Sequence, residues 1–364
     1  MKDLTIGFIG LGLIGGSIAR GIKRSRRDVR IMAYMRSRDK LEQAKRDGVV
    51  DVILDGIGEE ISWCDLVFLC TPVEYNASYL EQIRPLLKPG ALVTDVGSTK
   101  TDIHETVKRL GMEEVFVGGH PMAGSEKTGY ENSTDHLLEN AYYMITPTEK
   151  STPEQIGRIR RVALSIGAIP MVTDYRQHDF SVAAVSHLPH LVASSLVNLV
   201  RDNDNEEELM RTIAAGGFKD ITRIASSSPV MWEQICMTNT VNISRLLQDY
   251  IDALGVVQKE LQEHDSASLY TFFDGARAYR DSFIDAGSGP IKKDYSIRLD
   301  IPDEAGSIAA VSTLLALNNI SIKNIGIVHN REAQEGVLRI EFYEEDSITK
   351  AIQLLNRRGY VTHI

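Results

Sequence analysis

A histidine in a glycine-rich stretch is the first candidate for chemistry in this chain. Residues 118–126 read GGHPMAGSE, with His120 between a glycine pair and Pro121. Histidine is the side chain that exchanges a proton most readily near neutral pH, and glycine lets the backbone approach a ligand closely. The composition predicts an irregular loop that carries a general acid or base. An incidental histidine in a surface turn is the alternative, because loops and active sites share such compositions.

Two cations and two further histidines suit an anionic ligand. Lys219 and Arg223 are four residues apart, so they share one face of a predicted helix. The guanidinium fork of Arg223 suits a carboxylate, which it binds through two hydrogen bonds; a surface ion pair is the alternative. His187 and His190 lie three residues apart in an apolar helical segment. Two histidines without a third ligand nearby make a poor zinc site, so we predict no metal.

The start of the chain has the pattern that binds a dinucleotide. A short apolar strand precedes Gly10, Gly12 and Gly15, which have G-x-G-x-x-G spacing, and a helical pattern follows. The first glycine permits a tight turn, the second lets the pyrophosphate reach the backbone, and the third lets helix and strand pack closely. The backbone at the start of the helix, from Leu13 and Ile14 onward, then faces the phosphates.

Two later strands predict the other side of the cofactor cleft. Ligands in open α/β sheets bind beyond the carboxyl ends of the strands. Thr71 and Pro72 follow the buried strand at 66–70, and Ser98 follows the strand at 91–95. We therefore expect all three residues to line the nicotinamide side of the cleft. A helix N-cap is an alternative role for Ser98 that does not exclude the first.

The end of the second strand departs from the NAD pattern. An acidic residue is expected there to hold the adenosine ribose, but the chain continues Met35, Arg36, Ser37, Arg38. An arginine fork beside a hydroxyl is the chemistry that holds a 2′-phosphate, so Arg36 and Ser37 predict substantial use of NADP. The alternative is a solvated helix start with Ser37 as its N-cap.

Composition narrows the class of protein. The 364 residues are 43% hydrophobic and 25% charged, as in a globular protein of two or three domains. A net charge of −10 argues against a nucleic-acid partner. The three cysteines show no metal or disulfide spacing and fit a reducing compartment. We find no leader pattern and no apolar run that we expect to span a bilayer. The sequence therefore predicts a cytoplasmic protein without a membrane partner.

The order of elements predicts three domains. Strands and helices alternate over residues 1–173, which predicts an α/β Rossmann-type dinucleotide domain. Residues 174–286 predict an all-α domain for substrate binding and dimerisation. Its long helix at 180–200 is apolar almost all round and needs more cover than a small bundle offers, so we expect a homodimer. Residues 294–364 follow the ferredoxin-like α+β order β-α-β-β-α-β.

Taken together, the motifs resemble the prephenate dehydrogenase family of bacterial tyrosine biosynthesis, and residues 294–364 resemble an ACT domain, an amino-acid-sensing module. The resemblance covers essentially the whole chain and rests on these segments in order: 10–16, 95–100, 118–126, 186–190 and 216–232. It implies oxidative decarboxylation of prephenate to 4-hydroxyphenylpyruvate, with hydride transfer to NAD or NADP. The family commonly uses NAD, so NAD is retained beside the predicted NADP.

The resemblance also implies the roles of individual residues. His120 is the general base for the ring hydroxyl, with Ser98 beside it at the nicotinamide. The substrate-binding residues that it implies are His187, Arg223, Lys219, Ser125 and Glu126. L-Tyrosine is the implied effector of the ACT domain, and its implied site comprises Asp303, Gly306, Ser307 and Asn324. Two alternatives remain open. One is a related enzyme, either one with arogenate as the substrate or another β-hydroxyacid-type dehydrogenase of the same two-domain architecture, and the other is a catalytically silent nucleotide-binding amino-acid sensor.

Overall fold

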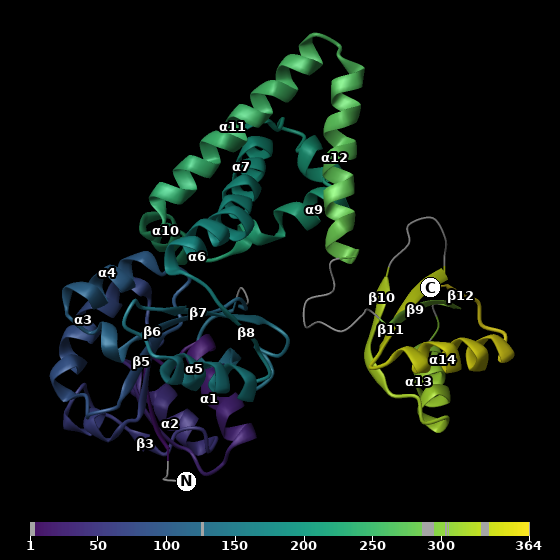
Figure 1. Cartoon of the computed structure of the whole chain (residues 1–364). Helices are drawn as coiled ribbons and strands as arrows, with labels where there is room; N and C mark the ends of the chain where they lie inside the picture. The colour runs from purple at the N-terminus through teal and green to yellow at the C-terminus, as the bar shows by residue number, and fades with distance from the viewer. Residues whose placement is uncertain are drawn as a thin grey trace. The chain divides into compact units, whose positions relative to one another are not determined.

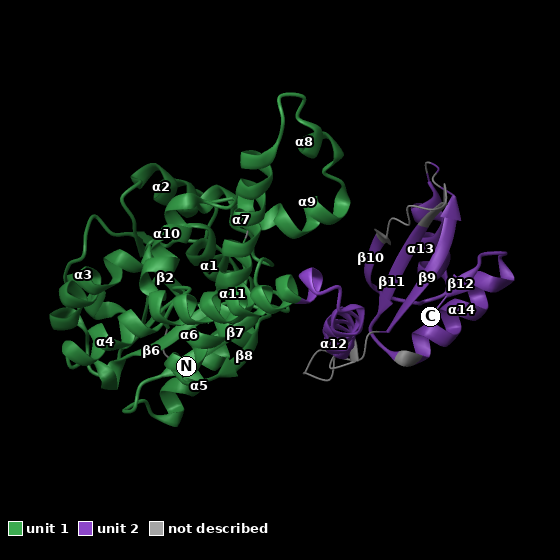
Figure 2. Cartoon of the chain, turned by 90° about the horizontal axis from the view of Figure 1, so that it is seen from above, with its two compact units in different colours: residues 1–259 green, residues 260–364 purple. Residues whose placement is uncertain are grey.

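The computed structural model describes residues 4–124, 127–285, 295–302, 304, 306–328 and 335–363. Ser125, Glu126 and Asp303, which the sequence analysis singles out, lie outside the described residues. The chain forms two compact units, residues 1–259 and 260–364 (Figure 2), and each is described by itself.

The first unit begins with a parallel five-stranded sheet in the order β3-β2-β1-β4-β5 (Figure 1). Its strands are β1 (Thr5–Ile9), β2 (Arg30–Tyr34), β3 (Val52–Ile53), β4 (Leu66–Leu69) and β5 (Leu92–Asp95). The order reverses between β1 and β4, and this switch point is where doubly wound folds bind dinucleotides. The predicted Rossmann-type fold is confirmed.

Helices cover both faces of this sheet because alternate side chains of each buried strand point to opposite faces. Ile6 and Phe8 pack on one side, and Val67 and Leu69 pack on the other. The first side is covered by α1 (Leu13–Ser25), α2 (Arg38–Arg46) and α5 (Pro153–Ser165), and the second by α3 (Val73–Ile83) and α4 (Thr101–Arg109). Among the described residues, the five strands have nearly continuous apolar sequences, as expected for a sheet buried on both faces.

A second, three-stranded sheet carries His120. It comprises β6 (Val117–Pro121), β7 (Tyr142–Pro147) and β8 (Ile169–Val172), with β6 antiparallel to β7 and β7 parallel to β8. His120 therefore lies within a strand, and the prediction of an irregular loop is wrong. Gly118 and Gly119 allow this strand to pack closely against its neighbours. A Cβ on Gly118 would lie 2.3 Å from the Thr146 hydroxyl, and one on Gly119 would lie 2.8 Å from the backbone oxygen of Asp95.

The helical part of the first unit starts with one long interrupted helix. It consists of α6 (Tyr175–Val182), a π-helical segment (Ala183–His187) and α7 (Leu188–Asn203). Single π turns inside helices are frequent at functional sites. The remaining elements are α8 (Leu209–Ile213), α9 (Gly216–Thr222), a 3₁₀ turn (Arg223–Ser226), α10 (Pro229–Thr238) and α11 (Thr240–Gln262), the last of which crosses the boundary between the units.

By length and composition, the helix from 175 to 203 is able to cross a bilayer, contrary to the expectation from the sequence. Only 22% of its most apolar window is buried, and Val185 is 71% exposed. A single such helix is weak evidence for a membrane span, because helices of water-soluble proteins also reach this length and apolarity. Its exposed apolar side chains agree with the predicted need for cover by another surface.

The second unit contains α12 (Ser266–Asp285) and a four-stranded antiparallel sheet in the order β10-β11-β9-β12. The elements that follow α12 are β9 (Ser296–Pro302), α13 (Ser307–Leu317), β10 (Ile322–Val328), β11 (Glu335–Phe342), α14 (Glu345–Arg357) and β12 (Thr362–His363). Leu299, Leu338 and Leu315 belong to its hydrophobic core. The predicted ferredoxin-like order is therefore confirmed.

Candidate functional site

The glycine turn between β1 and α1 has the geometry of a phosphate-binding loop. Gly10 has a φ of +88°, and a Cβ there would lie 2.6 Å from the backbone oxygen of Cys70. A Cβ on Gly15 would lie 2.9 Å from the Cys70 side chain, so this position keeps α1 close to the sheet. At Gly12 no heavy atom lies within 4 Å of the Cβ position. The open backbone at Gly12, at the N-terminus of α1, is accessible to an anion.

A cavity of about 200 Å³ adjoins this turn and brings the predicted cofactor residues together. Its wall is formed by Gly10 and Gly12, by the segment from Tyr34 to Ser37, by Cys70, Thr71 and Pro72, and by Tyr79. The sequence analysis did not anticipate Tyr34 and Tyr79, whose rings make an edge contact with centroids 6.4 Å apart. Leu13 and Ile14, in the first turn of α1, are half-buried. The residues present fit a dinucleotide.

The two arginines after β2 differ in their surroundings. Arg38 forms an ion pair with Asp55, whereas Arg36 lines the cavity with its guanidinium 5.5 Å from the ring centroid of Tyr75. Ser37 occupies the N-cap position of α2, but its side chain makes no capping hydrogen bond. Arg36 and Ser37 therefore both line the cavity, and an arginine beside a hydroxyl residue is the pair that the sequence analysis associates with a 2′-phosphate.

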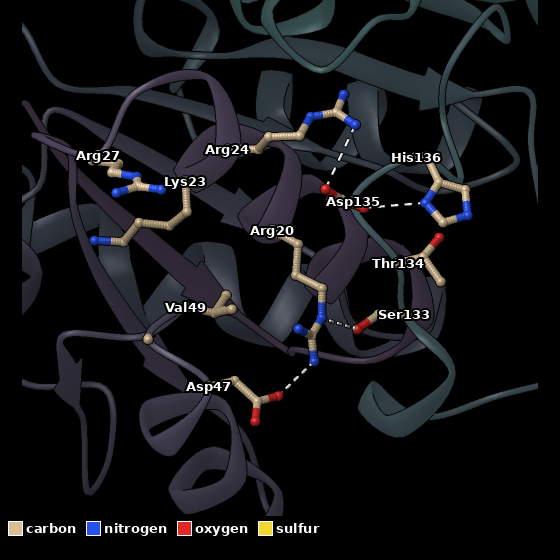
Figure 3. Close-up of a pocket in the computed structure, with 11 residues that line it drawn as sticks. Arg20, Lys23, Arg24, Arg27, Asp47, Val49, Ser133, Thr134, Asp135 and His136 are labelled. Carbon is tan, nitrogen blue, oxygen red and sulfur yellow. Dashed lines mark hydrogen bonds and ion pairs between the residues drawn. The ribbon is translucent and has the colours of Figure 1, made fainter.

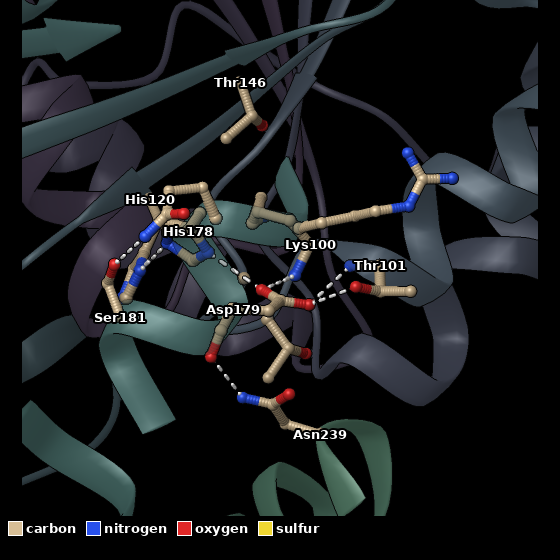
Figure 4. Close-up of polar contacts among 12 residues, drawn as sticks. Lys100, Thr101, His120, Thr146, His178, Asp179, Ser181 and Asn239 are labelled. Atoms are coloured by element: carbon tan, nitrogen blue, oxygen red, sulfur yellow. Dashed lines mark hydrogen bonds and ion pairs between the residues drawn. The ribbon is translucent and has the colours of Figure 1, made fainter. Parts of the chain in front are cut away.

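The central feature of the candidate active site is a buried chain of three side chains (Figure 4). The Nδ1 atom of His120 lies 2.9 Å from the Nε2 atom of His178. The Nδ1 atom of His178 lies 2.8 Å from the Asp179 carboxylate. The carboxylate and His178 are fully buried, and His120 is 9% exposed.

The hydrogen bonds of this chain determine where the protons lie. An ionised carboxylate only accepts, so His178 donates from Nδ1 to Asp179 and its Nε2 is an acceptor in the neutral ring. His120 must then donate from Nδ1 to His178. This leaves the lone pair of His120 on Nε2. A neutral imidazole with a free lone pair is the form that a general base needs.

Asp179 also connects α6 to the first sheet. Its carboxylate accepts hydrogen bonds from the backbone N–H groups of Lys100 and Thr101, at 2.8 and 2.7 Å, and from the Thr101 hydroxyl. It therefore caps α4 from a position 79 residues away. The N-cap position of α4 is Lys100, so the alternative role of Ser98 as a helix N-cap is wrong. Ser98 is half-buried in the turn between β5 and α4.

A buried ion pair supports both predicted catalytic residues. The Lys100 ammonium pairs with the Asp95 carboxylate, and both side chains are fully buried. Asp95 also accepts hydrogen bonds from the backbone N–H groups of Gly97, at 2.9 Å, and Gly119, at 3.1 Å. These glycines directly precede Ser98 and His120. One carboxylate thus anchors the backbone beside both.

Burial controls the protonation of this cluster. Desolvation holds the pKa of His120 well below its usual value, and electrostatic interactions with His178, Lys100 and His187 lower it further. Burial by itself raises the pKa of Asp179, but hydrogen bonds from His178 and Thr101 outweigh it, and the pKa is lowered. The site without ligands therefore holds a neutral His120 and an ionised Asp179 at neutral pH.

A second group of aromatic and polar side chains lies where α7 meets α10. His187 is 1% exposed, and its Nδ1 atom lies 3.2 Å from the amide nitrogen of Asn239. The rings of His190 and Trp232 are stacked with centroids 3.5 Å apart, and Trp232 makes an edge contact with His187 at 5.9 Å. The buried indole N–H of Trp232 has no hydrogen-bond partner among the described residues. An unpaired buried donor suits a bound anion.

The predicted cations lie on the helices that pack against α7. Arg223, at the end of α9, is close enough to His190 to lower the pKa of that imidazole further, after the larger effect of burial. Lys219 is exposed on the same helix. The structure therefore brings Arg223 to the His190 group, and it leaves Lys219 on the surface of α9.

A second cavity, of about 600 Å³, lies beside the C-terminal half of α1 (Figure 3). It is lined by four cations, namely Arg20, Lys23, Arg24 and Arg27. Arg20 forms an ion pair with Asp47 at 2.7 Å, and Lys23 forms one with Asp51 at 2.7 Å. The glycine turn lies at the other end of the same helix, so this cavity is not the predicted cofactor site.

In the second unit, the described part of the predicted effector site lies at the start of α13 and on β10. Gly306 has a φ of +99°, with no heavy atom within 4 Å of its Cβ position, and Ser307 begins the helix. Asn324 is exposed on β10, beside an irregularity in its pairing with β11. The backbone at Gly306 is thus open at the N-terminus of the helix, the end at which helices bind carboxylates.

Sequence reasoning missed His178, Asp179 and Asn239. The available signal for the first two was an adjacent histidine and aspartate directly before a long apolar helical segment, where a buried charged residue needs a partner. Trp232 lies within the segment that carries the family resemblance, but no role was predicted for it. Among the described residues, no group of three or more His, Cys, Asp or Glu side chains is arranged to hold a metal ion.

Comparison with known proteins gives consistent results. The profile described as prephenate dehydrogenase, nucleotide-binding domain, matches residues 18–172, and the profile described as prephenate dehydrogenase, dimerization domain, matches residues 174–274. The prephenate dehydrogenase of Bacillus subtilis (strain 168) is 36% identical over 361 residues, which cover 99% of this chain and 97% of that protein.

Two solved structures are also similar to this chain. The prephenate dehydrogenase from A. aeolicus in complex with hydroxyphenyl propionate and NAD+ has a TM-score of 0.73 and 29% identity, over 78% of this chain and 99% of that one. The Synechocystis arogenate dehydrogenase has a TM-score of 0.70 and 30% identity, over 77% of this chain and 100% of that one.

Proposed function

Because the chain belongs to the prephenate dehydrogenase family, we propose that it converts prephenate to 4-hydroxyphenylpyruvate and carbon dioxide with NAD or NADP. The observation that carries the proposal is the buried chain His120–His178–Asp179, which leaves the lone pair of His120 on Nε2. A silent amino-acid sensor does not need this arrangement.

A bound NAD or NADP would supply the acceptor for the hydride that leaves the ring carbon bearing the hydroxyl. Meanwhile His120 Nε2 accepts the hydroxyl proton, which increases the electron density that expels the hydride. The ring carboxylate leaves as carbon dioxide, and the electron pair of the broken bond restores the aromatic ring. The proton then returns to the phenolic oxygen, so no proton is gained or lost overall.

His178 and Asp179 stabilise the charge that develops on His120. Protonation of a buried imidazole is costly because the positive charge has lost its hydration. The ionised Asp179 compensates this charge through His178, and a substrate with two carboxylates raises the pKa of His120 further toward its usual value. We propose that this explains how a base whose pKa is lowered without ligands works near neutral pH.

We propose that His187 and Arg223 bind the substrate carboxylates, with Trp232 as an additional donor. The support is the burial of His187, the position of Arg223 near His190, and the unpaired indole N–H. Lys219, Ser125 and Glu126 remain proposed as border residues of this pocket on the resemblance. Ser98 is proposed to act beside His120, since Asp95 anchors the residues that precede both.

Arogenate is the second candidate substrate, because the Synechocystis arogenate dehydrogenase has a similar fold and 30% identity. Arogenate has an ammonium group where prephenate has a keto oxygen. The cations proposed for the pocket, Arg223 and Lys219, disfavour a positive charge in the ligand. Prephenate is therefore our first choice.

The region at 174–274 matches the family's dimerization domain, and we propose a homodimer formed through it. The exposed apolar side chains of α7 and α11 support this, among them Leu199, Val241 and Leu254. We also propose three domains, with boundaries near residues 173 and 286, and a cytoplasmic location, in agreement with three free cysteines. We further propose that the last domain is an ACT domain that binds L-tyrosine.

The direct test is the absorbance of reduced cofactor after the enzyme is mixed with prephenate and either NAD or NADP. We expect reduction that depends on prephenate, with release of one carbon dioxide for each reduced cofactor. The same assay with arogenate ranks the two substrates. If neither substrate reduces either cofactor, although fluorescence shows that the cofactor binds, the sensor alternative replaces the enzyme.

A further inference from the structure

Asn239, at the junction of α10 and α11, makes hydrogen bonds with three neighbours although it is only 4% exposed. Its amide nitrogen lies 2.8 Å from the backbone oxygen of Asp179 and 3.2 Å from Nδ1 of His187. Its amide oxygen accepts a hydrogen bond from the side chain of Asn242 at 2.8 Å. A buried amide with all these groups satisfied has a fixed orientation.

The orientation of this amide follows from the carbonyl that it contacts. A backbone oxygen only accepts, so the Asn239 atom that faces Asp179 must be the NH₂ group (Figure 4). The second N–H of the same group then points to His187. A donor at this position requires a lone pair on Nδ1 of His187. The proton of the neutral ring therefore lies on Nε2.

The surroundings keep this imidazole uncharged. Burial lowers the pKa of His187 to about 4, Asp179 on α6 opposes the change, and His178 and His190 reinforce it. His120 on β6 also interacts with it electrostatically, and the Trp232 ring, which carries no net charge, packs against it from α10. Protonation of Nδ1 would in addition bring two N–H groups together.

We propose that Asn239 is a positioning residue that fixes His187 in the tautomer with its proton on Nε2, so that His187 binds the substrate as an uncharged hydrogen-bond donor. The inference deepens the proposed function and rests on it only for the identity of the ligand. In this proposal Arg223 supplies the positive charge that binds the substrate carboxylates. His187 supplies a hydrogen bond of fixed direction.

The variant Asn239→Asp reverses this arrangement. A carboxylate opposite Nδ1 stabilises a proton there and raises the pKa of His187. The neutral ring then lacks the proton on Nε2, and only the imidazolium still donates from this atom. Substrate binding therefore becomes pH-dependent, strong in acid and weak in base, whereas His187 imposes no such dependence on the wild-type enzyme near neutral pH.

The test combines two measurements on the full-length enzyme. Carbon-13 NMR of labelled histidine reports the tautomer without substrate, with the His187 signal assigned by its absence in His187→Asn. We expect the Nε2–H tautomer in the wild type and a proton on Nδ1 in Asn239→Asp. For that variant we also expect KM for prephenate to rise with pH by about tenfold or more, the value of a hydrogen bond to a charged group, with little change in kcat.

Two further variants test the same inference if Asn239→Asp does not fold. Asn239→Ala should give a mixture of tautomers and a raised KM, and this KM effect should not add to that of His187→Ala. The matched control Asn242→Ala retains both N–H donors of Asn239 and should keep the wild-type tautomer. An Nδ1–H tautomer in the wild-type enzyme, an unchanged tautomer in Asn239→Ala, or additive KM effects would overturn the inference. A wild-type enzyme that has the expected tautomer but shows no prephenate-dependent reduction of the cofactor would instead count against the proposed function.

Discussion

The Nδ1 atom of His120 on β6 lies 2.9 Å from the Nε2 atom of His178 on α6, and this contact joins the sheet that carries the proposed base to the helix that follows it. Asp179 fixes the direction of the hydrogen bond by accepting from the other side of His178. The base therefore lies on one segment, whereas the residues that fix its tautomer and balance its charge lie on another. His120 and His178 are 58 residues apart in the sequence. The first two predictions concern this contact.

Replacement of His120 by Asn removes the proposed base but keeps a polar side chain of similar shape. We expect kcat to fall by about two to four orders of magnitude, the usual contribution of a positioned base. The dissociation constants of cofactor and substrate, measured by fluorescence titration, should change little. A large loss of substrate binding with nearly normal kcat would instead make His120 a binding residue.

Replacement of His178 by Leu removes the acceptor for His120 Nδ1–H and separates His120 from Asp179. Both tautomers of His120 then become accessible, and the protonated ring loses its counter-charge. We expect kcat to fall by about one to two orders of magnitude, the range of a hydrogen bond to a charged group, with KM little changed. The acid limb of the kcat profile should move, because the pKa of the base depends on this neighbour.

The control for this prediction is His104→Leu. His104 is also buried, but it stacks on Tyr175 and contacts the Thr146 hydroxyl, and it makes no direct contact with the His120–His178–Asp179 chain. Its replacement should lower stability while kcat stays close to normal. Equal losses of kcat in the two variants would show that His178 acts only through packing.

The sequence predicted those parts of the site that depend on local patterns. The glycine turn at Gly10 and the strand order follow from spacing and periodicity, and His120 stood out by its neighbours. The prediction failed where contacts are long-range. His120 lies in a strand because Gly118 and Gly119 pack closely against β5 and β7, which glycine composition alone does not distinguish from a loop.

The buried charged and polar residues around the site were also not predicted, because their partners cannot be read from local patterns. Lys100 and Asp95 are five residues apart and fully buried, although such residues are usually exposed unless they are paired. Asp179 caps a helix that starts 78 residues earlier, and Asn239 meets His187 from a position 52 residues away. One sequence contains no pattern that reports contacts across such separations.

The stability of the protein should decrease in mild acid because several histidines are buried in the neutral form. Burial lowers the pKa of His104 and of His187 to about 4. The unfolded chain binds these protons near pH 6.5, so its proton uptake exceeds that of the folded state between about pH 6.5 and 4, and stability falls as the pH falls through this window. Above about pH 6.5, the buried neutral histidines no longer make stability depend on pH.

Each such histidine contributes on the order of 3 kcal/mol across its window. Urea unfolding at several pH values between neutrality and about pH 4.5 measures the effect. His104→Gln should be less stable than the wild type at neutral pH, but its free energy of unfolding should depend less on pH. A free energy that stays constant across the window would contradict this account of the buried histidines.

The choice of cofactor depends on Arg36 and Ser37 at the cavity beside the glycine turn. If their side chains hold a 2′-phosphate, Arg36→Ala should weaken NADP binding by about 1.5–3 kcal/mol, the value of a charged hydrogen bond, with NAD little affected. Arg38→Ala is the matched control, because Arg38 pairs with Asp55. Equal effects of Arg36→Ala on both cofactors would show that Arg36 does not bind a 2′-phosphate, and NAD would then be the expected cofactor.

L-Tyrosine should inhibit the enzyme through its C-terminal domain. The accessible helix start at Gly306 and Ser307 suits the carboxylate of an amino acid, and Asn324 offers an exposed amide on β10. Inhibition from a distance requires that tyrosine bind one global state of the enzyme better than another. A chain that ends at residue 285 should therefore remain active and lose its response to tyrosine.

A point variant separates this effect from truncation itself. Asn324→Ala should raise the tyrosine concentration needed for half-inhibition by about tenfold, as expected for one hydrogen bond to a charged group, whereas its neighbour Lys323→Ala should not. Both side chains are exposed, so neither change should disturb folding. Tyrosine resembles the product 4-hydroxyphenylpyruvate in its ring. If the truncated enzyme is inhibited at the same tyrosine concentration, and prephenate relieves that inhibition, tyrosine competes at the active site instead.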